Sequence, residues 1–192
     1  MKLDGRILYL TDDVDQISAQ LDGVDLSLRA DAEMHYGVNT DAMISGRACT
    51  LGYTPEILGP YFLENFRETV SKDAVRSGGF QVVVGGDAYG SGSSREVAVV
   101  AHEGAGIELV IARSFQRIFQ ENMVYAGMPF TTDYGVTDRL RSGEDVDTSE
   151  FFSELPPFFK QVANLGGLLP YARAWLEGRV DPWYETETAA RP

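Results

Sequence analysis

The sequence has little cysteine, no long apolar stretch and few positive charges. Its 192 residues include one cysteine, Cys49, so the chain can form no internal disulfide and no metal centre with several thiolate ligands. No apolar run approaches the ~18 residues of a membrane-spanning helix. Residues 1–5 lead straight into a strand-like segment and lack the apolar core of a signal peptide. We therefore expect a cytoplasmic protein with no membrane partner.

Positive charge is scarce as well. The chain has 16 Lys and Arg residues against 29 Asp and Glu residues, which gives a formal net charge of −13. Such a charge repels nucleic acid and anionic membrane surfaces, so neither is expected as a partner. A small anionic ligand would need positive charge concentrated at its own site. The hydrophobic content of 44% is ordinary for a globular protein, and we expect one domain, residues 1–178, followed by a flexible tail, residues 179–192.

The most informative stretch is residues 82–96. Three valines predict a short buried strand, and the glycines that follow, among them Gly90 and Gly92, permit positive φ and close approach of a ligand to the backbone. Ser93 and Glu96 have the spacing of a capping box, which predicts that a helix starts at this point. A strand, a glycine loop and a helix N-terminus together form an anion site, to which Arg95 adds a cation suited to carboxylates.

Several familiar glycine loops do not fit this stretch. A P-loop needs a lysine where Ser91 stands. The dinucleotide-binding fingerprint needs a third glycine where Arg95 stands, and the Gly-x-Ser-x-Gly elbow of serine hydrolases is absent. Taken by spacing alone, Ser93 could equally be a helix cap and Arg95 a surface cation.

A longer comparison of motifs favours a particular family. Residues 89–96, Tyr-Gly-Ser-Gly-Ser-Ser-Arg-Glu, resemble the YGxGSSRE loop of the swivelling domain of the aconitase superfamily. Residues 111–122 are similar to that family's IAxSFARIFxxN segment. Residues 155–158 and 166–171 resemble the C-terminal part of isopropylmalate isomerase small subunits. The resemblance covers about residues 5–176 and is poor between residues 20 and 45, which we interpret as an insertion.

This resemblance implies an α/β fold of the swivelling-domain type. Its central mixed sheet has a parallel β-α-β core flanked by helices, and the expected strand–helix–strand–helix order after residue 82 agrees with a right-handed crossover. Pro55 is expected at the first position of a helix that runs to Phe66. His35 has no cysteine or second histidine nearby and is interpreted as a surface or core residue rather than a metal ligand. His102 is interpreted as structural, because it lies two turns into the expected helix, away from its N-terminus.

The resemblance also assigns roles to individual residues. The family eliminates water from a hydroxy acid and adds it back at the neighbouring carbon. By the motif, Ser93 is the base, Ser94 hydrogen-bonds either a substrate carboxylate or the base, and Arg95 binds a carboxylate. Asp15 is expected to reach the active site, Asp13 is a second and less critical acid, and Leu51 and Gly52 lie over the substrate's variable group.

The family's reaction also needs a Lewis acid for the departing hydroxyl, and one cysteine cannot hold an iron–sulfur cluster. The resemblance therefore implies that no cofactor is bound by this chain and that a separate large subunit carries a [4Fe–4S] cluster. The expected partners are that subunit and a small hydroxy diacid, with homo-oligomers when the chain is isolated. Three readings stay open: an isopropylmalate isomerase subunit, a specialised isomerase for citramalate, homoaconitate or another substituted malate, and a non-catalytic anion-binding module. Val97 replaces the family's usual histidine, which leaves that histidine's role unassigned.

Overall fold

The computed structural model describes residues 1–28 and 32–180. Residues 29–31 of the expected insertion and residues 181–192 of the expected tail lie outside the described residues. The strands are β1 Arg6–Tyr9, β2 Phe80–Gly85, β3 Leu109–Ala112 and β4 Phe130–Thr131. The α-helices are α1 Val14–Leu21, α2 Thr40–Met43, α3 Gly46–Cys49, α4 Pro55–Leu58, α5 Ala74–Ser77, α6 Glu96–Gly104, α7 Arg117–Ala126, α8 Val136–Arg141, α9 Pro157–Asn164 and α10 Leu168–Leu176. Three short 3₁₀ turns are η1 Gly59–Tyr61, η2 Phe66–Glu68 and η3 Thr148–Phe152.

The four strands form one sheet in the order β1-β2-β3-β4. Every described strand pair is parallel, so the expected α/β class and parallel β-α-β core are confirmed, whereas the described sheet is parallel rather than mixed. The reason lies in the connections, because each strand from β2 onward is followed by a helix that returns the chain to the same edge. All six residues of β2 are buried, as a strand covered on both faces requires.

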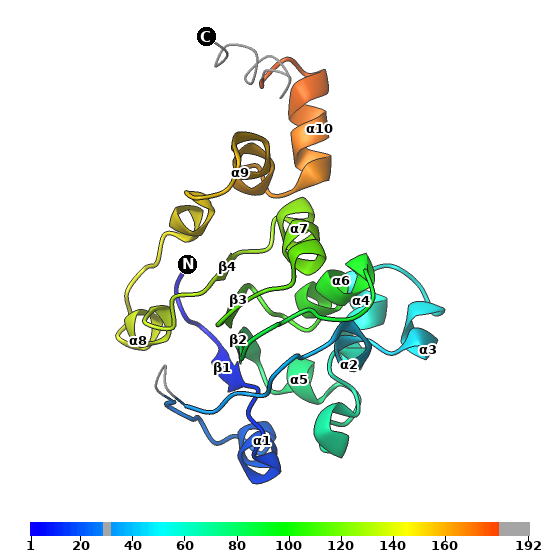
Figure 1. Ribbon diagram of the computed structural model, residues 1–192, viewed down its shortest axis with the longest axis vertical. Coiled ribbons are helices and arrows are strands. Elements are labelled where there is room, and N and C mark those ends of the chain that lie inside the picture. Colours follow the sequence, from blue (N-terminus) through cyan, green and yellow to red (C-terminus); the bar gives the residue numbers. More distant parts are fainter. Residues whose placement is uncertain (29–31, 181–192) are drawn as a thin grey trace.

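Alternate residues of the strands feed two separate apolar clusters. Leu8, Val83 and Val110 are paired neighbours on the face that packs against α6 and α7. The residues between them face the opposite side, where they pack with Val136 and Leu140 of α8. Figure 1 shows α6 and α7 on one side of the sheet and α8 on the other. The period-two alternation of a strand therefore builds a three-layered core.

The helix expected from Pro55 to Phe66 is shorter in the structure. Pro55 does occupy the first turn of α4, but the helix ends at Leu58 and the chain passes through η1. Gly59 lies against α6 so closely that an added Cβ would come within 2.1 Å of the Gly104 carbonyl oxygen. Gly59 itself keeps helical backbone angles, and Pro60, which has no N–H to donate, follows it in η1. The chain leaves the helical conformation at Phe62, with ψ of 123°, and Leu63 has φ of 58°.

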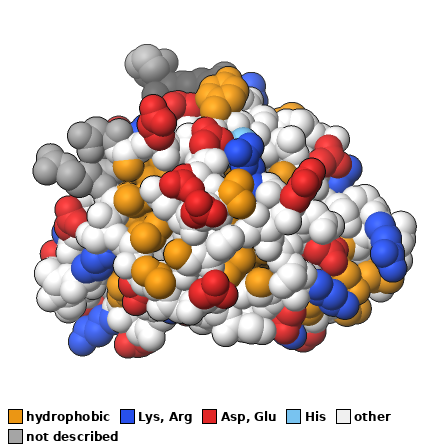
Figure 2. All heavy atoms as spheres, turned by 90° about the horizontal axis from the view of Figure 1, so that it is seen from below, with side chains coloured by type: hydrophobic (Ala, Val, Ile, Leu, Met, Phe, Trp, Pro, Cys, Tyr) orange, Lys and Arg blue, Asp and Glu red, His pale blue; other side chains and the backbone are white. Residues whose placement is uncertain are grey.

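The C-terminal part contains two short helices, α9 and α10. Figure 1 shows α10 extending away from the sheet, and Leu169 and Leu176 are 83% and 80% exposed there. Among the described residues, none of the helices has the length and apolar character to cross a bilayer. Figure 2 shows acidic and basic side chains intermingled over the face seen from below, so the net negative charge is not confined to one part of that face.

Candidate active site

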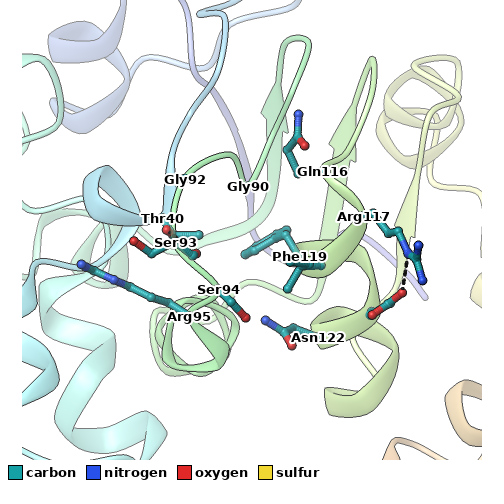
Figure 3. A pocket seen from close by; sticks show the side chains of 12 residues that line it. Thr40, Gly90, Gly92, Ser93, Ser94, Arg95, Gln116, Arg117, Phe119 and Asn122 are labelled. Atoms are coloured by element: carbon teal, nitrogen blue, oxygen red, sulfur yellow. Dashed lines mark hydrogen bonds and ion pairs between the residues drawn. The ribbon is translucent and has the colours of Figure 1, made fainter.

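A cavity of about 500 Å³ lies beyond the carboxyl end of β2. The glycine loop forms one wall and the first turns of α7 form the other (Figure 3). Parallel strands whose carboxyl ends meet at one edge place the loops after β2 and β3 side by side. Tyr89 pairs with Phe115 there, and the Gln116 N–H donates to the Tyr89 carbonyl at 2.9 Å. The lining residues are Thr40, Gly90, Gly92, Ser93, Ser94, Arg95, Gln116, Arg117, Ile118, Phe119, Glu121 and Asn122.

The two glycines expected in the anion loop both line this cavity. Gly90 has φ of 79° and Gly92 has φ of 91°, values at which a side chain is strained. At Gly90 an added Cβ would also come within 2.2 Å of the Phe119 ring. Only glycine lets the loop pass over this ring, and the loop thereby comes within reach of α7.

Ser93 does not cap the following helix. The capping box predicted a helix start at Ser93, but α6 begins at Glu96 with Arg95 at the N-cap position, and no side chain caps it. The loop stays extended for two residues longer because Thr40 Oγ1 donates to the Ser93 carbonyl at 2.8 Å. Ser93 and Ser94 are exposed to the cavity side of the loop, and the unpaired N–H groups of the first turn of α6 follow directly. Ser93 is therefore not the helix cap that its spacing suggested.

Arg95 lines the same cavity and already holds a carboxylate. Its Nη1 donates to the Ile44 carbonyl at 2.8 Å and its Nη2 pairs with Asp41 Oδ1. The Arg95 side chain is 22% exposed, while that of Asp41 is 58% exposed. The guanidinium is therefore fixed in direction by a buried carbonyl on one side and by a removable, solvated carboxylate on the other.

Residues 37–41 form a second support of the loop that the motifs did not indicate. The Gly90 N–H donates to the Val38 carbonyl at 2.9 Å, and the Thr40 N–H donates to the Ser91 carbonyl at 2.8 Å. Asn39 and Ser91 form an isolated parallel bridge. Almost all of these contacts use backbone atoms, which any residue type supplies. The available signal was modest: Asn39 precedes a short apolar segment and caps α2.

A buried pair beneath the loop was also not anticipated. His102 is fully buried on α6, where Nδ1 lies 2.7 Å from the Ala98 carbonyl and Nε2 lies 2.7 Å from the Tyr89 hydroxyl. Because a carbonyl only accepts, Nδ1 carries the proton and the Tyr89 hydroxyl donates to Nε2. Burial lowers the pKa of His102 to about 4 and raises the pKa of Tyr89. A neutral histidine therefore ties the start of the loop to α6, in agreement with its expected structural role.

Three of the expected site residues do not line the cavity. Asp15 is exposed on α1, and the Asp13 carboxylate accepts from its N–H at 2.9 Å as the cap of that helix. Leu51 is 49% exposed. At Gly52 an added Cβ would come within 2.6 Å of Ile57 Cδ1, so the Ile57 side chain occupies the space beside this glycine. Their roles remain predictions.

The described residues contain no group of three or more histidine, cysteine, aspartate or glutamate side chains that could hold a metal ion. His35, the other histidine, pairs with Asp12 at 2.6 Å. Cys49 is a single free thiol. An iron–sulfur cluster, which needs three or four thiolates, does not fit this chain.

Similar proteins agree with the fold and the loop. The Aconitase C-terminal domain family matches residues 66–132. A crystal structure of 3-isopropylmalate dehydratase from Methanocaldococcus jannaschii covers 75% of this chain and 92% of that chain, with a TM-score of 0.51 and 26% identity. The sheet, the glycine loop and this match define an α/β domain of the aconitase superfamily.

The curated relatives are more specific. The isopropylmalate/citramalate isomerase small subunit of Methanocaldococcus jannaschii is 34% identical over 71% of this chain and 87% of that protein. The 3-isopropylmalate dehydratase small subunit of Methanosarcina acetivorans is 34% identical over 74% of this chain and 93% of that protein. The chain belongs to the family of 3-isopropylmalate dehydratase small subunits.

Proposed function

We propose that this chain is the small subunit of a two-subunit hydro-lyase. The enzyme dehydrates and rehydrates a 2-hydroxy diacid such as 3-isopropylmalate, as in leucine biosynthesis, and so moves the hydroxyl to the neighbouring carbon. The observation that carries the proposal is the shared cavity. Ser93, Ser94 and Arg95 line it together at the uncapped start of α6.

In this proposal Ser93 removes the proton from the carbon α to a carboxylate. An ordinary serine hydroxyl is too weak an acid to be deprotonated at neutral pH, so its alkoxide needs stabilisation. The donors available for this are the first-turn N–H groups of α6, whose N-terminus no side chain caps, and Arg95, which lines the same cavity. As Ser93 takes the proton, a carbon–carbon double bond forms and the carbon–oxygen bond breaks; the departing hydroxide takes up a proton from solvent to become water, and the reverse steps add water at the other carbon.

Arg95 binds one substrate carboxylate and Ser94 hydrogen-bonds to it. The Asp41 carboxylate on Arg95 Nη2 supports this role, since the guanidinium already donates to a carboxylate. The substrate would take the place of a carboxylate that is more than half exposed.

The Lewis acid comes from a partner in this proposal. Because a cluster does not fit the cysteine content of the chain, we infer a large subunit that carries a [4Fe–4S] cluster and closes over the cavity. Relatives that are named small subunits support such a partner. The name of one relative includes citramalate, which favours citramalate as the second candidate substrate.

The test is reconstitution with the large subunit encoded in the same genome. Turnover of 3-isopropylmalate, citramalate and homoaconitate is followed by the absorbance of the unsaturated diacid. We expect turnover by the pair and none by this chain alone. Turnover by the isolated, cluster-free chain would overturn the two-subunit reading. A pair that binds the diacids and turns over none of them would favour an anion-binding module.

A further inference from the structure

One polar atom in the cavity wall has no partner. Asn122 lies on α7, and its Nδ2 atom is buried without a hydrogen-bond partner among the described residues. Asn122 lines the cavity together with Ser94. Figure 3 shows the side chains of Ser94 and Asn122 pointing toward one another across it, with Arg95 on the other side of Ser94.

An unpaired buried donor is unfavourable. Leaving a buried N–H₂ without an acceptor costs about 1–3 kcal/mol, and most buried polar groups in proteins avoid this cost by pairing. The unpaired Asn122 carboxamide of the free chain is explained when a ligand supplies the missing acceptor. The other polar atoms nearby give the chemistry of that acceptor.

The groups that face the cavity are mainly donors. Arg95 is a cation, and neither α6 nor α7 has a side-chain cap at its N-terminus. The one carboxylate in the lining, Glu121, accepts from Arg117 Nε at 2.9 Å. An acceptor-rich anion therefore matches this wall. The proposed substrate has two carboxylates, while Arg95 suits only one.

We propose that Asn122 binds the second carboxylate of the diacid, through a hydrogen bond from Nδ2, while Arg95 binds the first. This assignment rests on the proposed function, since it names a further residue of the same site. Ser93, which lines the same cavity, would then meet a substrate that is anchored at both ends. Such anchoring fixes which carbon faces the base.

The kinetic test uses Asn122→Asp and Asn122→Ala in the reconstituted two-subunit enzyme. Asn122→Asp keeps the shape but replaces the donor with a negative charge, so KM for the diacid should rise 10- to 100-fold, with a smaller change in kcat. Asn122→Ala should raise KM about tenfold. Gln120→Glu is the matched control, because it makes the same change on α7 at a residue outside the cavity lining; its KM should change less than threefold.

A stability measurement separates binding from a structural role. Because Nδ2 has no protein partner, Asn122→Ala should leave the Tm of the chain unchanged or raised. A clear fall in Tm with an unchanged KM would overturn the assignment, since Asn122 would then be structural.

A third measurement does not depend on turnover. The side-chain amide resonances of Asn122, identified by their loss in Asn122→Asp, should shift when 3-isopropylmalate is added to the ¹⁵N-labelled chain. If the wild-type pair is inactive but these resonances shift, the proposed reaction fails and the binding role stands. If the pair is active and neither KM nor the resonances respond, the role of Asn122 is refuted while the proposed function stands.

Discussion

The two sides of the glycine loop differ in how they are written in the sequence. On the loop itself, side chains and glycines carry the proposed function, and residues 89–96 form a motif that can be read without a structure. The facing segment, residues 37–41, supports the loop almost entirely through backbone hydrogen bonds. Backbone atoms are the same in every residue. A support of this kind therefore leaves no motif, even where it contacts the predicted base.

The largest expected effect is on the loop side. Ser93→Ala in the reconstituted enzyme should lower kcat at least ~10²–10⁴-fold, because it removes the proton acceptor. Ser91→Ala is the matched control, since its hydroxyl only donates to the Gly37 carbonyl at 3.2 Å. Far-ultraviolet circular dichroism and co-purification with the large subunit should be unchanged in both variants. An active Ser93→Ala enzyme would contradict the catalytic role proposed for the loop side of this comparison.

The outcome for the fold follows the same division. The strands around residues 82–84 and 109–112 and the helix after the loop were predictable, because apolar runs and glycine punctuation reflect burial and turns. The helix start at Glu96 and the early end of α4 were not predicted. The first goes with a hydrogen bond from Thr40 to the Ser93 carbonyl, a long-range contact that local spacing does not encode. The second had a local signal that the prediction missed, since Pro60 lacks the N–H that a continuing helix needs.

The candidate site divides in the same way. The motif predicted Ser93, Ser94 and Arg95, and all three line one cavity. Asp41 and the Tyr89–His102 pair became visible only in the fold, because their partners lie 54 and 13 residues away. Asn122 stood within a quoted segment, but its unpaired amide depends on what surrounds it.

The next largest effect concerns what holds the loop from beneath. The folded-state pKa of His102 is about 4, against an ordinary value of 6.5. The unfolded chain thus binds a proton between pH 6.5 and 4 that the folded chain does not, so the free energy of unfolding falls as the pH is lowered through this window. The expected loss is about 3 kcal/mol. Urea unfolding of wild type and of His102→Gln, which does not titrate, isolates this contribution. Equal pH dependence in both proteins would mean that His102 takes up its proton at the same pH in the folded and the unfolded chain.

A third test asks whether another segment joins the site on assembly. Gly52→Arg should weaken turnover of an alkyl-malate relative to a tricarboxylate, by about 10- to 100-fold in the ratio of kcat/KM, if residues 51–52 lie over the substrate's variable group. Gly52→Ala is the control, because it displaces Ile57 without adding charge. An unchanged ratio would place the specificity contacts elsewhere.

The smallest effect is expected in residues 37–41, the segment that carries no sequence motif. Thr40→Val removes the hydrogen bond from Oγ1 to the Ser93 carbonyl while it keeps the shape of a side chain that is 1% exposed. The free energy of unfolding should fall by about 1 kcal/mol, and kcat should fall less than tenfold. Thr40→Ser retains the hydroxyl and should stay close to wild type in both measurements. A loss of activity as large as that of Ser93→Ala would show that one side chain of residues 37–41 matters as much as the loop.

The backbone contact between Gly59 and Gly104 fixes the position of the C-terminal end of α6. An added Cβ at Gly104 would come within 2.0 Å of the Pro55 carbonyl oxygen, so neither glycine can be enlarged without moving backbone. The nine residues of α6 span about 13 Å, and Arg95 and Ser93 lie at the opposite end. A side chain added at Gly59 or Gly104 would shift α6 along its axis or tilt it. Mutations at this distant joint would then resemble active-site mutations in their kinetics, while the cavity itself kept every one of its residues.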